Sequence, residues 1–149
     1  MKPLIALLTH QHRLIVETLE QAYKYGISTS DGQAHLIMAK DALIDHLKHE
    51  DNEFFPVLLR IADADIRLKA MLWSLEDEMR PVTAMALAFF RKYHAGGSGN
   101  EFAREFGVFS AHLRSRIRRE ETLLFPIFER APESWVATPT ARIPLHQAA

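Results

Sequence analysis

One eleven-residue segment of the chain occurs twice, and this near-repeat limits what the chain can fold into. Residues 46–56 read His-Leu-Lys-His-Glu-Asp-Asn-Glu-Phe-Phe-Pro, and residues 116–126 read Arg-Ile-Arg-Arg-Glu-Glu-Thr-Leu-Leu-Phe-Pro. Residues four apart share one face of an α-helix, so the first copy directs His46 and Glu50 to one point. The second copy directs Arg116 and Glu120 instead. Two such helices facing each other would build a metal site of which only one half is complete.

The spacing of apolar residues predicts helices throughout the chain. Apolar side chains recur at helical intervals in four long blocks, at residues 4–25, 33–61, 66–94 and 101–130, and no stretch alternates as a strand would. Short segments rich in glycine and polar residues separate the blocks. The pattern predicts an all-α protein, an antiparallel up-down four-helix bundle with an internal two-fold repeat. We expect the bundle to occupy residues 1–131 and an irregular tail to follow at 132–149.

Two prolines fall inside the expected helices. Pro56 lies near the end of the second block, and Pro81 lies in the middle of the third. Proline removes one backbone hydrogen bond and clashes with the carbonyl four residues earlier. We therefore expect a kink at each position.

The repeat extends to the first and third blocks. The first block carries Gln-His-Arg at residues 11–13, and the third carries Glu-Met-Arg at residues 78–80. Each half of the chain is thus one pair of helices, and packing about a pseudo-two-fold axis would bring the marked positions to a common centre. These positions are His12, His46, Glu50, Met79, Arg116 and Glu120. The second half has lost both of its histidines.

Composition narrows the function classes. The formal net charge is -1, and the chain has no cysteine and no long apolar run, so we expect neither nucleic-acid nor membrane partners and a soluble, cytoplasmic protein. Without thiolates, any metal ligands are nitrogen and oxygen atoms. No serine accompanies a histidine on an apolar face, so a non-enzymatic role is favoured over catalysis. The oligomeric state stays open, with a homodimer as one option.

Over residues 4 to 130 the chain resembles the hemerythrin-like family, the HHE cation-binding domains. The resemblance rests on His12, on His46 and Glu50 with the following Phe-Phe-Pro, and on Glu120 within Arg-Glu-Glu-Thr-Leu-Leu-Phe-Pro. Members of this family are antiparallel four-helix bundles that hold two non-haem irons between histidines and bridging carboxylates. The resemblance implies iron binding and the handling of dioxygen, nitric oxide or redox chemistry.

The chain departs from the family pattern in one half of the site. Met79 and Arg116 stand where the resemblance places histidines of the second iron, so we expect at most one metal ion. The expected ligands are His12, His46, Glu50 and Glu120. A mixed imidazole and carboxylate set suits ferrous iron, zinc or manganese and does not fix the identity of the metal. The resemblance implies iron, and a centre without metal is the remaining alternative. A metal-binding protein of this kind would bind or sense iron, O2 or NO.

Arg116 leaves two geometries open. A guanidinium is costly to bury alone, so it requires partners, and the carboxylates of Glu50 and Glu120 are the obvious ones. In that arrangement Arg116 replaces the lost iron electrostatically, and a metal-free bundle would serve as an interaction or regulatory module. Alternatively, the long side chain extends out of the core to solvent and leaves the site free.

Overall fold

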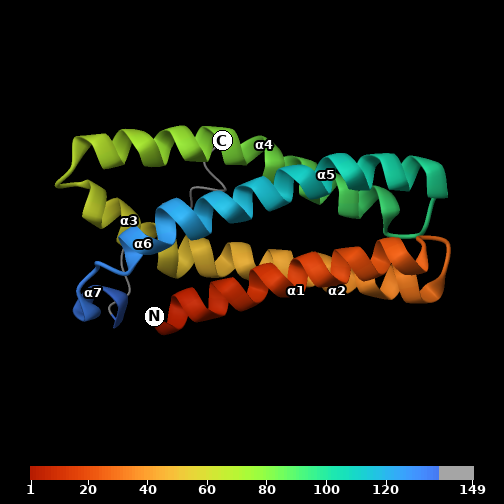
Figure 1. The fold of residues 1–149 in the computed structure, drawn as a ribbon, viewed down its shortest axis with the longest axis horizontal. Coiled ribbons are helices and arrows are strands. Elements are labelled where there is room, and N and C mark those ends of the chain that lie inside the picture. Colours follow the sequence, from red (N-terminus) through yellow and green to blue (C-terminus); the bar gives the residue numbers. More distant parts are fainter. Residues whose placement is uncertain (138–149) are drawn as a thin grey trace.

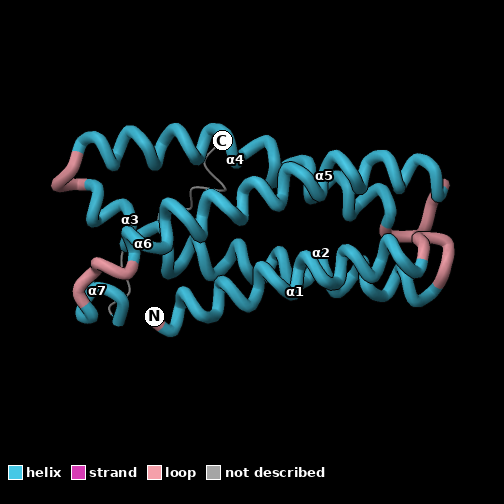
Figure 2. Tube along the Cα trace, in the orientation of Figure 1, coloured by secondary structure: helices cyan, strands magenta, loops and turns pink. Residues whose placement is uncertain are grey.

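Four long helices run side by side along the computed structural model, which describes residues 1–137 (Figure 1). They are α1 (Pro3–Tyr25), α2 (Ser30–His49), α4 (Ile66–Tyr93) and α5 (Gly99–Arg119). Figure 2 shows that loops join them at the ends of the bundle, so that successive helices are antiparallel. Residues 1–137 contain no strand. The predicted all-α, up-down four-helix bundle is therefore confirmed.

Each half of the chain has the same order of elements. In the first half, α1 and α2 are followed by the π-helical segment η1 (Glu50–Phe54) and the short helix α3 (Phe55–Ala62). In the second half, α4 and α5 are followed by η2 (Glu120–Leu124) and α6 (Phe125–Phe128). The duplicated sequence segment thus produces a duplicated local structure.

The two π-helical segments have a common cause in the prolines that follow them. Pro56 and Pro126 have no N–H, and in a continuous α-helix each ring would clash with the carbonyl four residues earlier. The chain widens by one residue before each proline, because the N–H of Phe55 donates to the carbonyl of Glu50. The equivalent bond runs from Phe125 to Glu120. The expected kink at Pro56 is realised as this wide turn, whereas α4 continues as one helix through Pro81.

The connection between α1 and α2 depends on two glycines. Gly26 ends α1 with a φ of 91°, a left-handed conformation that residues with a Cβ rarely adopt. Gly32 lies so close to it that an added Cβ would sit 1.9 Å from the carbonyl oxygen of Gly26. The hydroxyl of Thr29 accepts a hydrogen bond from the N–H of Gly32 and caps α2. This tight turn lets α1 and α2 pack along most of their length.

The apolar core is divided into two clusters. One surrounds the π-helical end and includes Leu8, Phe54 and Phe128, each fully buried. The other fills the opposite half and includes Ile15 and Phe109. A layer of buried polar side chains lies between them on all four long helices: Gln11, His12, His46, Glu50, Glu76, Thr83, Arg116 and Glu120. Burial of the two apolar clusters therefore holds a polar layer away from water.

The C-terminal part packs against the π-helical end of the bundle. The tail that was expected to be irregular begins with a short helix, α7 (Glu133–Ala137), and residues 138–149 lie outside the described part of the chain. The guanidinium carbon of Arg60 lies 4.1 Å from the ring centre of Trp135, and Lys2 Nζ lies 2.9 Å from a carboxylate oxygen of Glu133. None of the helices in residues 1–137 combines the length and apolar character that a membrane crossing requires.

Candidate metal centre

Four side chains converge in the polar layer. His12 comes from α1, His46 from α2, and Glu50 and Glu120 are the first residues of η1 and η2. One ligand atom from each of the four lies within 4.8 Å of the corresponding atoms of the others. Their exposed fractions are 2%, 3%, 0% and 0%. The structure therefore brings together, away from solvent, the four residues that the sequence singled out.

The imidazoles face the carboxylates through the same ring nitrogen. His12 Nε2 lies 2.9 Å from Glu120 Oε2, and His46 Nε2 lies 3.1 Å from Glu50 Oε1 and 3.7 Å from Glu120 Oε2. The two imidazole rings are 4.6 Å apart between their centres. Two nitrogens and two oxygens thus surround one point.

The outward ring nitrogens are held by side-chain acceptors. His46 Nδ1 donates to Gln11 Oε1 at 3.1 Å, and the amide of Gln11 is oriented by its own donation to Asp45 Oδ2 at 3.1 Å. His12 Nδ1 lies 2.9 Å from Glu121 Oε1, a carboxylate that accepts the ring N–H. A neutral imidazole with its proton on Nδ1 presents the lone pair of Nε2 to the centre. Histidine ligands of metals are held in this way, with the other ring nitrogen donating to a carboxylate or an amide.

Arg116 is buried and joins the two glutamates. Its exposed fraction is 6%, so the side chain does not extend to solvent. Nε donates to Glu120 Oε1 at 2.8 Å, one terminal nitrogen donates to Glu50 Oε2 at 3.1 Å, and the other donates to the hydroxyl of Thr83 at 2.6 Å. The first of the two geometries left open by the sequence is therefore the one found.

Each glutamate divides its two oxygens between the halves of the layer. Glu50 directs Oε1 to His46 and Oε2 to Arg116. Glu120 directs Oε2 to the imidazoles and Oε1 to Arg116. The guanidinium thus occupies the side of the carboxylates that faces the second half of the repeat. The other oxygens stay with the two histidines.

The second half offers few further ligands of the same kind. Met79, with an exposed fraction of 3%, belongs to the apolar cluster at the π-helical end, and its thioether is a soft ligand that suits iron poorly. Glu76, one turn earlier on α4, is also buried and interacts electrostatically with Arg116. Among the described residues, the only group of histidines and acids close enough to hold a metal is His12, His46, Glu50 and Glu120, to which the second half contributes Glu120 alone.

The buried charges alter one another's protonation. Burial acts to lower the pKa of His46, but the carboxylates of Glu50 and Glu120 outweigh it and raise the pKa to about 10. Burial and Glu50 act to raise the pKa of Glu120, yet Arg116 and the two imidazoles hold it below its ordinary value. Burial likewise opposes the charge on Arg116, and the two glutamates more than compensate, so its pKa lies above the usual range. In the absence of metal, protonated His46 and Arg116 balance the two carboxylates.

Three supporting residues were not identified from the sequence. Gln11 was noted only as the neighbour of His12, and Glu121 only as part of a motif, because outward contacts cannot be read from helical spacing. Thr83 was missed although it lies four residues after Met79, where a polar residue on an apolar face is a readable signal. His112 on α5 and Glu53 on η1 are exposed, so neither side chain belongs to the buried layer.

Comparison with known families agrees with this geometry. The sequence model of the hemerythrin HHE cation-binding domain matches residues 4–128, which is most of the chain. Searches among curated proteins and among solved structures gave no match. The matched segment contains all four long helices and the four converging side chains. The chain therefore belongs to the hemerythrin HHE cation-binding domain family.

Proposed function

We propose that this protein binds one divalent metal ion, iron in preference to zinc or manganese, through His12, His46, Glu50 and Glu120, and binds or senses iron, O2 or NO. The division of the carboxylate oxygens is the observation that carries the proposal. One oxygen of each glutamate faces the histidines, and the other is bonded to Arg116. A site for one ion is thus combined with a fixed positive charge on the side where a second ion would lie.

The distances between the four side chains fit a single ion. Metal bonds to imidazole nitrogen and carboxylate oxygen are about 2.0–2.2 Å long, so two ligand atoms of one ion lie roughly 3 to 4.4 Å apart. The corresponding atoms here already lie within 4.8 Å of one another. Only small side-chain shifts are needed, and the outward bonds to Gln11 and Glu121 keep Nε2 of both rings directed inward.

A single ion at this centre would have positions for a small ligand. Four protein ligands leave two positions of an octahedral ferrous ion for exogenous molecules. A cavity of about 190 Å³ lies between α4 and α5, and both Met79 and Arg116 are among the residues that line it. This volume accommodates a diatomic molecule. The two open positions on the ion support O2 or NO as the ligand class, and a cytoplasmic location remains our prediction.

Metal content tests the proposal directly. We expect protein produced with added iron and purified without chelator to contain about one ion per chain by mass spectrometry of the elements. His46→Ala removes an inward-facing ligand and should reduce the content below about one tenth of an ion per chain. His94→Ala, an exposed histidine at the end of α4, is the matched control and should leave the content unchanged. A wild-type value near zero would contradict the proposal.

Restoring the lost histidines tests why only one ion is expected. The double variant Met79→His, Arg116→His removes the guanidinium from the two carboxylates and supplies two imidazoles, so we expect it to take up about two ions per chain. Circular dichroism should first establish that the variant retains its helices. A folded double variant that holds no more metal than its parent would show that the assignment of the lost half is wrong.

A second function is favoured by the charge balance of the metal-free centre. Arg116 and protonated His46 together match the charges of Glu50 and Glu120, and the hydroxyl of Thr83 accepts a further hydrogen bond from Arg116. The ion pairs of such a centre neutralise its carboxylates without a metal ion. In this alternative the bundle is an interaction or regulatory module that acts through contacts of its surface with a partner. Stoichiometric metal in the purified protein would remove it.

The stability of the metal-free protein should depend on pH through His46. Its pKa is about 10 in the folded protein, against an ordinary value of 6.5. The folded state therefore holds a proton that the unfolded state releases, so this contribution is fully present below pH 6.5 and is lost as the pH rises through 10. We expect the thermal midpoint of the metal-free protein to fall over this interval, and the fall to be smaller in His46→Gln. Equal slopes in the two proteins would contradict the assigned protonation.

A further inference from the structure

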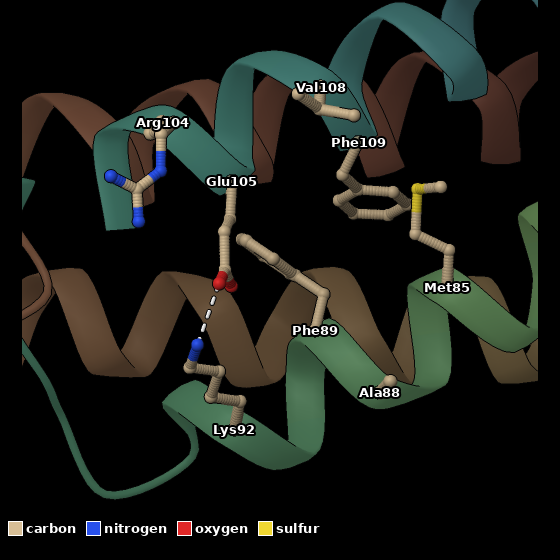
Figure 3. A pocket seen from close by; sticks show the side chains of 8 residues that line it. All are labelled: Met85, Ala88, Phe89, Lys92, Arg104, Glu105, Val108 and Phe109. Carbon is tan, nitrogen blue, oxygen red and sulfur yellow. Dashed lines mark hydrogen bonds and ion pairs between the residues drawn. The ribbon is translucent and has the colours of Figure 1, made fainter. Parts of the chain in front are cut away.

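We propose that the cavity between α4 and α5, at the end of the bundle away from the π-helical segments, binds an aliphatic carboxylate of medium chain length. Figure 3 shows this cavity. Its volume is about 470 Å³, within the range of about 300–1,000 Å³ typical of small-molecule sites. The inference concerns a site distinct from the metal centre and does not depend on metal binding.

The two walls of the cavity are facing helical stripes. On α4 the lining residues are Met85, Ala88, Phe89 and Lys92, and on α5 they are Arg104, Glu105, Val108 and Phe109. Neighbouring members of each stripe are one or three positions apart, so each stripe lies along one side of its helix. We call the cavity between these two stripes the slot.

One end of the slot is apolar. In Figure 3, Met85 and Phe109 lie together at that end, with Val108 above them and Phe89 toward the middle. Phe89 and Phe109 are anchored in the core, whereas Val108 is 52% exposed. Displacement of water from such an apolar surface by a hydrocarbon chain is favourable in free energy. The apolar end therefore fits an alkyl tail.

The other end of the slot carries two cations, Lys92 and Arg104, and two carboxylates, Glu101 and Glu105. Glu105 is already engaged, because it accepts from Lys92 at 2.6 Å and from the hydroxyl of Tyr93 at 2.9 Å. Lys92 bonds Glu101 as well, which uses two of its three donors. Within residues 1–137, Arg104 forms no ion pair shorter than 4 Å, although it lines the same end of the cavity.

A carboxylate matches this arrangement better than other head groups. A guanidinium binds a carboxylate through two parallel N–H bonds, and the third donor of Lys92 lies at the same end of the slot. A cationic head group would meet Arg104 and Lys92 while the only lining acid, Glu105, is already paired. An uncharged head group would not form the paired N–H bonds to the exposed guanidinium of Arg104. A carboxylate with a straight alkyl tail satisfies both ends.

Binding of decanoate and of decanol by isothermal titration calorimetry tests this inference. We expect the full chain to bind decanoate more tightly than decanol. Arg104→Gln should weaken decanoate binding by about tenfold and leave decanol within about twofold, because only the charged contact is lost. Arg91→Gln, an exposed arginine of α4 outside the cavity, is the matched control and should leave decanoate binding unchanged.

A second pair of variants tests the location. Ala88 is an exposed residue that lines the slot, so Ala88→Trp should abolish binding of both molecules without disturbing the core. Ala70→Trp, at an exposed alanine on the same helix but outside the cavity, should bind as the parent does. Absence of decanoate binding by the parent would overturn the proposal, as would equal affinities for decanoate and decanol. A dimer that buries this face and excludes decanoate would also overturn it.

Discussion

The structure depends on one buried cation shared by two carboxylates. Arg116 bonds Glu50 and Glu120 between two apolar clusters, where neither glutamate has access to water. Removing one partner of a buried ion pair leaves an uncompensated charge and commonly costs about 3–5 kcal/mol, so none of the three residues is independent of the others. The same contact also limits the number of metal ions that the site can hold. Because the guanidinium takes one oxygen of each carboxylate, the remaining oxygens and the two imidazoles form a site of a size that suits one ion.

The geometry of this centre comes from the backbone as much as from the side chains. Both glutamates begin a π-helical segment, and each segment precedes a phenylalanine–proline pair. Wide turns of this type often occur at functional sites, because they re-aim side chains within an otherwise regular helix. The duplicated turns place Glu50 and Glu120 at equivalent heights in the bundle. At the centre the first half of the repeat supplies two imidazoles and the second half supplies a guanidinium, and both groups contact the two carboxylates.

The fold and the inner residues of the site were readable from the sequence because both depend on helical spacing. The first and third apolar blocks match α1 and α4, whereas the second and fourth each span a long helix, a π-helical segment and a short helix. The four-residue interval from His46 to Glu50 places both side chains in one layer. The π-helical turns were not predicted beyond a kink at Pro56, since spacing alone does not reveal how a chain accommodates a missing N–H. The choice between the two geometries of the Arg116 side chain could not be predicted from the sequence either. The buried geometry depends on the hydrogen bond to Thr83 and on how deeply the polar layer is buried. The spacing of residues along one helix defines neither.

Anomalous X-ray diffraction at the iron edge, from crystals of protein loaded with ferrous iron, tests the central claim most directly. The account predicts one peak per chain, at bonding distance from Nε2 of His12 and His46 and from the inward oxygens of Glu50 and Glu120. Electron density for Arg116 should still join the outward oxygens of the two glutamates. Two peaks per chain, or no peak with the four side chains in place, would contradict the account.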